Sequence, residues 1–113
     1  SVYSWVHKHH HRQHTPTRGN LDAVNVHPFE FIAGEYNHLL AVYLLSNILP
    51  CHISAVVAFI AIGGLGASLN HTRYNVNLPF GAYSVKAHDV HHRLPQSNYG
   101  QYIMLWDQVM GSY

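Results

Sequence analysis

Histidine is the residue type in this chain with the clearest capacity for chemistry. Twelve of the 113 residues are histidine, and the spacing His-x-x-His-His occurs twice, once near each end. On a helix, residues three and four positions apart share a face, so we expect each copy to aim three imidazoles at one small volume. Neutral imidazole binds Fe, Zn, Cu and Ni, and the repeat therefore predicts a metal site. The six residues are His7, His10, His11, His88, His91 and His92.

The composition favours a membrane-associated protein. Apolar residues make up 48% of the chain and charged residues only 10%, whereas about 25% charged residues is usual in a soluble domain. A net charge of +1, without a basic stripe interleaved with aromatic residues, argues against nucleic-acid binding. The lone cysteine, Cys51, excludes an internal disulfide and a cysteine-based zinc site. At this length we expect one domain, covering residues 1–113.

Two apolar segments are expected to form the helices that position the histidines. The first spans about residues 27–47, with Pro28 and Glu30 in its first turn, where proline and an acidic side chain are favourable. The second, residues 53–69, contains no charged residue, and its length of about 25 Å approaches the bilayer core of about 30 Å. A buried helix of a soluble protein could have the same length. The small residues at 63–68 favour close helix packing in a membrane.

The positive charges predict how these segments are oriented. All six Lys and Arg residues lie outside both segments, and the connection from Ser46 to His52 carries none. In a hairpin, every positive charge would therefore lie on one side, which the positive-inside rule makes cytosolic. Both histidine motifs fall on that same side. The predicted fold is an all-α integral membrane helical hairpin with a cytosolic histidine-rich metal-binding cap.

The two ends of the chain are also expected to be helical. Residues 1–12 have the pattern of a helix end that carries the first motif, and residues 98–111 that of a capped amphipathic helix. Gly111 is the expected stop of the second of these helices. Aromatic residues near both ends are interpreted as anchors at the membrane interface, namely Tyr3, Trp5, Tyr99, Tyr102 and Trp106.

The remaining histidines favour structural roles over metal binding. His9 and His14 lie beside the first motif but outside its spacing, and we interpret both mainly as residues that do not bind metal. His27, next to a proline, is expected to organise a loop or to hydrogen-bond a ligand. His52 lies at the uncharged connection, on the far side of the predicted hairpin, and is interpreted as structural.

Two polar groups leave two interpretations open. His38 follows Glu35 by three residues on an otherwise apolar helix. This pair either orients the metal site or forms a buried structural hydrogen bond. Asp89, inside the second motif, either accepts a hydrogen bond from a ligand imidazole or stands at the start of a helix.

Taken in order, the motifs resemble the fatty acid hydroxylase superfamily, which includes sterol desaturases and methylsterol oxidases. The match runs over nearly the whole chain. The motifs are His7-Lys8-x-His10-His11 with Pro16-Thr17, His27-Pro28-x-Glu30, Asn70-His71-x-x-Tyr74, and His88-Asp89-x-His91-His92. The closing segments Asn98-Tyr99-Gly100, Trp106-Asp107 and Gly111-Ser112-Tyr113 are similar to the C-terminal signature of that family.

The resemblance implies a membrane-bound di-iron oxygenase that hydroxylates or desaturates a lipid, either a sterol or a fatty acyl substrate, with O2 and external electrons. An unactivated C–H bond requires such metal chemistry, because no acid–base side chain can attack it. The resemblance implies a dinuclear iron centre, which zinc can replace in purified samples because its affinity for the same ligands is higher. By motif position the metal ligands would be His7, His10, His11, His71, His88, His91 and His92.

The resemblance also implies partners and a location. The partners would be the lipid substrate, the bilayer and an electron donor such as cytochrome b5 or ferredoxin with its reductase. The location would be the endoplasmic reticulum membrane in a eukaryote, with the metal site on the cytosolic side. The family carries a further histidine box upstream, so we expect the chain to be N-terminally incomplete. Seven ligands then form a partial site, and we expect these residues alone to be catalytically silent although the full-length protein is an enzyme.

Two other functions stay open at this point. One is an acyl-lipid desaturase of the other histidine-box family, and the other is a non-enzymatic histidine-rich metal-binding or transport protein of the membrane. The C-terminal signature and the Asn70-His71 motif favour the hydroxylase superfamily over the first. Transporters place ionisable ligands at membrane depth, whereas the histidine motifs here flank the apolar segments.

Overall fold

The computed structural model describes residues 2–113, so Ser1 lies outside the described residues. The chain is mostly helical, as predicted, and departs from an all-α fold in one short antiparallel strand pair. Phe80 and Gly81 reverse the chain between these strands with φ angles of 58° and 68°. The elements in order are α1 (Val2–Val6), η1 (His10–Arg12), α2 (Asn20–Ala23), α3 (Pro28–Ser46), α4 (Ile53–Asn70), β1 (Asn77–Leu78), η2 (Pro79–Gly81), β2 (Tyr83–Ser84), α5 (Val85–Arg93) and α6 (Leu105–Met110).

The two long helices, α3 and α4, begin and end within about a residue of the predicted segments. Each begins with a histidine cap. The His27 ring accepts a hydrogen bond from the backbone N–H of Phe29 (3.2 Å), and the His52 ring accepts one from the N–H of Ser54 (3.2 Å). Such caps satisfy N–H groups that the helix itself leaves without a partner. His52 is thus structural, as interpreted, and His27 organises the start of a helix.

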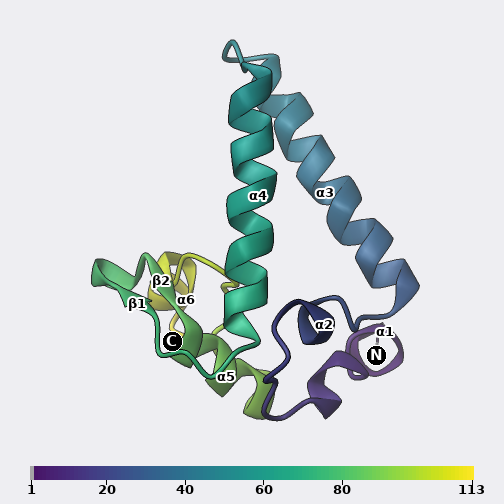
Figure 1. The fold of residues 1–113 in the computed structure, drawn as a ribbon, viewed down its shortest axis with the longest axis vertical. Coiled ribbons are helices and arrows are strands. Elements are labelled where there is room, and N and C mark those ends of the chain that lie inside the picture. Colours follow the sequence, from purple (N-terminus) through teal and green to yellow (C-terminus); the bar gives the residue numbers. More distant parts are fainter. Residues whose placement is uncertain (1) are drawn as a thin grey trace.

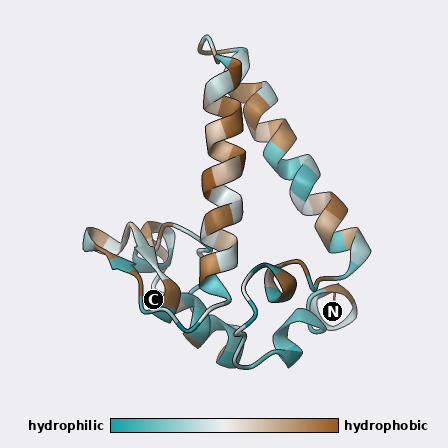
Figure 2. Cartoon of the chain, viewed as in Figure 1, coloured by the Kyte–Doolittle hydropathy of each residue, from teal (hydrophilic) through white to brown (hydrophobic). Residues whose placement is uncertain are grey.

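The long helices form an inverted V (Figure 1). They meet at the 47–52 connection and diverge toward the level where the shorter elements gather, which we call the open end. Figure 2 shows α4 as predominantly hydrophobic and the open end as rich in hydrophilic residues. Among the described residues there is one helix, α4, whose length and apolar composition are sufficient to cross a membrane. That α3 and α4 span a membrane as a hairpin, with a cytosolic cap, stays a prediction.

The buried core is polar. Within the described residues, four hydrophobic residues are buried, Val6, Val85, Ala87 and Met104, against nine buried polar residues. Buried polar groups cost free energy unless they are paired, so a core of this composition needs a dense network of partners. The nine are His10, His11, Asp22, Asn70, His71, His88, His92, Asn98 and Asp107.

The N-terminal helix is shorter than predicted. α1 ends at Val6, and the first histidine motif continues through a turn into the single turn of η1. The prediction of one helix through residue 12 was therefore wrong. The backbone N–H groups of His7 and Lys8 both donate to the carbonyl of Tyr3 (3.0 and 2.9 Å), which closes the helix at this point.

The C-terminal helix is shorter too. α6 covers only Leu105–Met110 and ends at Gly111, whose φ of 71° is the expected helix stop. The preceding residues form a loop because the Asp107 carboxylate accepts hydrogen bonds from the backbone N–H groups of Tyr99 and Gly100 (2.7 Å each). Side-chain acceptors of this kind compete with helix formation. Tyr102 therefore lies off the helix that its periodicity predicted.

Candidate metal centre

The seven predicted ligand histidines converge at the open end of the V in two adjacent groups. In the first group all members are buried, and in the second only His11 is. Within each group, the nitrogen atoms that could bind a metal lie within 4.8 Å of one another. That these residues bind a metal stays a prediction. The first group is His10, His71, His88 and His92, and the second group is His7, His11 and His91.

Each His-x-x-His-His motif is divided between the two groups, which corrects the expectation that a motif serves one volume. In the second motif the first and last histidines, four residues apart, stay together because they share a face of α5. The first motif lies in a turn and in η1, and there the Nε2 atoms of His7 and His11 approach to 2.8 Å without a common α-helix. The middle histidine of each motif joins the pair from the other motif. Thus His10 lies with His88 and His92, while His91 lies with His7 and His11.

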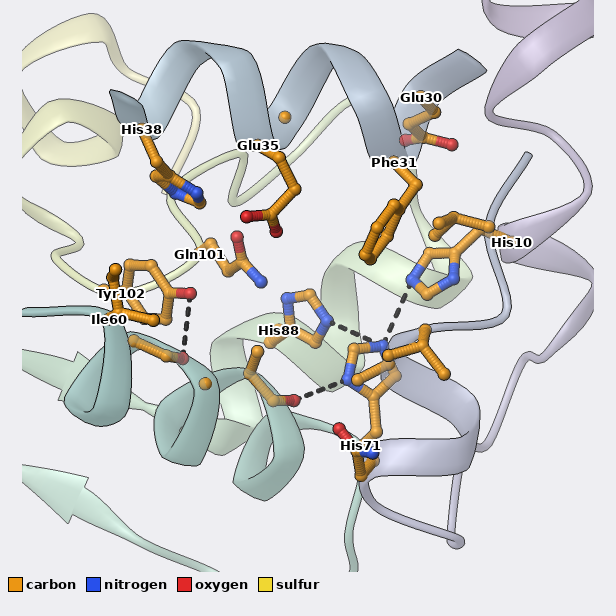
Figure 3. Close-up of a pocket in the computed structure, with 18 of the residues that line it drawn as sticks. His10, Glu30, Phe31, Glu35, His38, Ile60, His71, His88, Gln101 and Tyr102 are labelled. Carbon is orange, nitrogen blue, oxygen red and sulfur yellow. Dashed lines mark hydrogen bonds between the residues drawn. The ribbon is translucent and has the colours of Figure 1, made fainter. Parts of the chain in front are cut away.

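The imidazoles of the first group present their Nε2 atoms to one point, as Figure 3 shows for His10, His71 and His88. A tetrahedral metal with bonds to nitrogen of about 2.0–2.1 Å separates its ligand atoms by about 3.3–3.4 Å. The Nε2 spacing in the first group therefore fits a metal ion. The Nε2 of His71 lies 3.1 Å from that of His10, 3.2 Å from that of His92 and 3.5 Å from that of His88, and the last two are 3.1 Å apart.

Contacts of the Nδ1 atoms, on the side of the rings away from the centre, favour the tautomer whose Nε2 can bind a metal. Four of these histidines turn Nδ1 toward a backbone carbonyl. A ring that donates from Nδ1 keeps its lone pair on Nε2, which is the metal-binding form. The four contacts join His71 to Ala67 (2.8 Å), His91 to Ser97 (2.7 Å), His10 to Asn25 (3.3 Å) and His11 to His92 (3.4 Å).

The second group is bordered by aromatic and acidic side chains. The Nε2 atoms of His7 and His11 are 2.8 Å apart. The Tyr3 ring lies 5.8 Å from both of their rings, and the Tyr99 ring lies 5.8 Å from that of His91. These two tyrosines, interpreted from the sequence as interface anchors, thus pack against the histidines.

Burial keeps the clustered imidazoles neutral. Removal from water lowers the pKa of each buried ring, and neighbouring imidazoles in the cluster add repulsion that lowers it further. At neutral pH the rings therefore hold no extra proton that a metal would have to displace. The resulting pKa is about 4 for His10, about 4 for His11, about 3 for His92 and about 2 for His88.

Asp22 supports the site but was not linked to it by sequence reasoning. Its carboxylate accepts hydrogen bonds from the backbone N–H groups of Thr17 and Arg18 (2.9 Å each) and pairs with the Arg18 guanidinium. Burial alone would raise its pKa, but these partners lower it to about 2. In the loop that they hold, the N–H of Gly19 donates to the carbonyl of His71 (2.9 Å). No local spacing in the sequence indicated this connection.

Glu30 was also missed as a residue of the site. Its Oε1 contacts the Nδ1 of His7, across 23 residues of sequence. From the sequence, Glu30 was interpreted as an acidic residue in the first turn of a helix and as part of the His27-Pro28-x-Glu30 motif, without a role at the metal site. The His-Pro-x-Glu motif was the signal that could have found it, because the motif sets the carboxylate one turn into α3.

The other candidate polar residues lie outside both groups. His9 and His14 are exposed and belong to neither group. The His38 ring contacts that of Phe59 on α4 at 5.7 Å. Asp89 lies in the middle of α5 and pairs with Arg93 one turn on, so its helix-start interpretation was wrong. Among the described residues, a guanidinium rather than a ligand imidazole holds its carboxylate.

A cavity of about 580 Å³ opens between α3 and α4 and reaches the histidines. Figure 3 shows Glu35 and His38 of α3 on one side of it, with Gln101 and Tyr102 of the C-terminal loop facing them. The Tyr102 hydroxyl donates a hydrogen bond to the carbonyl of Gly63 (3.0 Å). Toward the connection the lining of the cavity is apolar, from Leu39, Val42, Val56, Phe59 and Ile60. An elongated apolar molecule could therefore reach the first group along α4.

Comparisons with known proteins indicate the family to which the chain is similar. The family model described as fatty acid hydroxylase matches residues 1–112. A Delta(7)-sterol 5(6)-desaturase of Leptosphaeria maculans is 34% identical, over 99% of this chain and 30% of its own length. The enzymes of that name from Candida glabrata and Saccharomyces cerevisiae are 31% and 29% identical, each over 99% of this chain and 29% of their own length. The chain thus spans about 30% of these relatives. No solved structure matches significantly.

Proposed function

The chain belongs to the fatty acid hydroxylase family, and we propose that the protein carrying it is a membrane-bound oxygenase that hydroxylates or desaturates a lipid with O2 and external electrons. The observation that carries this proposal is the convergence of four Nε2 atoms, 3.1–3.5 Å from their neighbours, at the end of an apolar cavity. The whole protein is the subject of the proposal, because the chain spans only part of its relatives.

The two histidine groups would hold two metal ions, functionally iron. The Nε2 spacing, the Nδ1 contacts with carbonyls and the lowered pKa values all fit this use. When bound, the metal supplies the redox chemistry with dioxygen that attack on an unactivated C–H bond requires. Zinc competes for the same nitrogen ligands in purified protein.

The chain's own residues bind the lipid and orient the ligand rings. The apolar lining of the cavity removes the hydrocarbon of the substrate from water, and its far end brings that hydrocarbon to His71 and His88. The carbonyls of Ala67 and Ser97 keep the rings of His71 and His91 turned toward the centre. These residues hold the reacting carbon and the metal ligands in fixed positions, which is the part of catalysis that a protein supplies to a metal.

The substrate is proposed to be a sterol or a fatty acyl lipid. The names of the relatives, Delta(7)-sterol 5(6)-desaturases, support a sterol. The candidate span α4 and the six Lys and Arg residues outside the apolar segments support a membrane location with the histidines on the cytosolic side, in the endoplasmic reticulum of a eukaryote. Reduction of dioxygen to water takes more electrons than the substrate supplies, so a donor such as cytochrome b5 or ferredoxin with its reductase is proposed.

Metal stoichiometry and O2 uptake test this proposal on the detergent-purified protein that carries the chain. We expect about two irons in the unmodified protein and about one in each of His88→Ala and His91→Ala, because these residues belong to different groups. Lipid-dependent O2 uptake should be lost in both variants. His14→Ala, at an exposed position outside both groups, should keep both irons and the activity.

Two outcomes would contradict the proposal. A folded protein without stoichiometric metal would exclude an oxygenase centre at these histidines. Two tightly bound metals without O2 uptake, for any sterol or acyl lipid supplied with an electron donor, would favour the non-enzymatic metal-binding alternative.

A further inference from the structure

The ring of His7 differs from the other supported rings in its partner. Four histidines turn Nδ1 toward a backbone carbonyl, which is neutral. The Nδ1 of His7 instead contacts a carboxylate oxygen of Glu30, while its Nε2 lies 2.8 Å from the Nε2 of His11. The His7 ring thus links the second group on one side to an acidic side chain on the other.

The second oxygen of Glu30 has no partner of its own. Its Oε2 is buried and, among the described residues, makes no hydrogen bond. A buried carboxylate oxygen is costly unless hydrogen bonds or an opposite charge compensate it. A metal cation bound by the second group would supply that opposite charge, because it would lie on the other side of the His7 ring from the carboxylate.

The donor sets of the two groups are also unequal. The first group has four buried histidines, whereas the second has three, two of which are half-buried. We propose that Glu30 is the positioning residue of the second metal site, holding the Nε2 of His7 toward His11 and His91 and offsetting the charge of the bound metal. This inference rests on the proposed function.

The proposed role has a chemical consequence. A carboxylate that accepts the Nδ1–H of a ligand histidine fixes its tautomer and increases the basicity of Nε2, which strengthens the bond to the metal. Glu30 also lies on α3, whereas His7 follows α1. The contact therefore holds the ring of His7 against the start of α3, so the position of that helix acts on the second site through His7.

A helix-start role is the competing explanation for Glu30. A carboxylate in the first turn of α3 interacts favourably with the helix dipole. Its removal would then lower the stability of the fold and would affect the two metal sites alike. The proposed role predicts a loss that is confined to one site, so the two explanations give different results in a metal titration.

The experiment is a titration of the metal-free, detergent-purified protein with Co(II), followed by calorimetry and by the visible absorption of the bound cobalt. Glu30→Gln keeps the size of the side chain and removes its charge, and Glu30→Asp keeps the charge. We expect Glu30→Gln to weaken one of two cobalt sites by about 10- to 100-fold and to alter its spectrum. Glu30→Asp should recover part of that affinity. Tyr36→Phe, at an exposed position of the same helix that does not line the cavity, should leave the affinity of both sites unchanged.

The possible outcomes are distinct. Equal affinity of both sites in Glu30→Gln and the unmodified protein would overturn the inference and leave the proposed function intact. An equal loss at both sites, with a lower melting temperature of the metal-free protein, would assign Glu30 to the fold and would also overturn it. An unmodified protein that binds no cobalt would remove the proposed function and this inference together.

Discussion

The buried imidazoles at the open end are neutral in the metal-free protein. Burial holds His10, His88 and His92 in the neutral form. The same burial makes them a cost to the metal-free fold in acid, because an unfolded chain protonates these rings freely near pH 6.5. Their effect on stability can therefore be measured without identifying the substrate.

We predict that the metal-free protein loses stability as the pH falls from about 6.5 to about 4.5. The pKa of His10 is lowered to about 4, that of His92 to about 3 and that of His88 to about 2. In this window the unfolded state binds more protons than the folded state, so the free energy of unfolding decreases with decreasing pH. Each such histidine contributes up to about 1.4 kcal/mol per pH unit. Thermal unfolding in detergent at a series of pH values measures the slope.

His14→Asn and His88→Asn provide matched controls for this slope. His14 is exposed, so its replacement should leave the pH dependence unchanged, whereas replacement of buried His88 should flatten it. The window lies above the range in which Asp22 titrates, since its pKa is lowered to about 2 from an ordinary value of 3.8. A melting temperature that stays constant between pH 6.5 and 4.5 would show that the cluster is hydrated or already protonated.

Among the elements, α4 and the C-terminal loop depend on a close contact at Gly66. A Cβ atom at Gly66 would lie 3.1 Å from the Cε1 atom of the Tyr102 ring, whereas a Cβ at Gly64 would meet nothing within 4 Å. The glycine thus allows the Tyr102 ring to lie close to α4 and its hydroxyl to donate a hydrogen bond to the carbonyl of Gly63. The loop that carries Tyr102 also receives a hydrogen bond from the side chain of Asn70, through the carbonyl of Gln101 (2.7 Å).

We predict that Gly66→Ala is less stable than Gly64→Ala by about 1–3 kcal/mol, because the added methyl group at position 66 displaces the Tyr102 ring. Gly64→Ala is the matched control on the same helix. It should be neutral or stabilising by up to about 1 kcal/mol, since alanine favours a helix more than glycine does. Thermal unfolding of both variants gives the comparison. Equal melting temperatures would mean that Tyr102 does not pack against α4 in solution.

In the molecule as a whole, the buried core is polar and the long helices expose apolar side chains, which is the opposite of the usual arrangement in a soluble domain. The side chain of Ile62, in the middle of α4, is 70% exposed and does not line the cavity. A helix whose apolar side chains face outward all round is typical of a membrane span. We therefore expect the location of the protein to depend on α4.

We predict that Ile62→Arg reduces the membrane-bound fraction of the protein, because a charge at the centre of a span costs about 2.5–3.5 kcal/mol on insertion. Leu21→Arg is the control, since Leu21 on α2 is similarly exposed (65%) but lies at the open end. The readout is the amount of protein that stays in membranes after an alkaline carbonate wash. Retention of both variants to the same extent would argue that α4 does not cross the bilayer.

Much of the architecture could be read from local pattern. The bounds of α3 and α4 follow from apolar-rich stretches that start at His27-Pro28 and after Pro50, since a helix depends on residues near in sequence. The predicted terminal helices were too long for a reason that is not local to their periodicity. Asp107 binds the N–H groups of Tyr99 and Gly100 and holds that segment as a loop.

The sequence alone determined which residues gather, because the repeated histidine spacing and the chemistry of imidazole need no fold to be recognised. Only the tertiary structure decided how they are shared. His10 meets His71 across 61 residues, and it lies with His88 and His92, while His91 lies with His7 and His11, so each motif is split between two groups. Likewise, only the approach of α3 to the turn after α1 brings Glu30 to His7. Contacts between distant segments depend on how the helices pack, and the spacing of residues within one segment does not specify that packing.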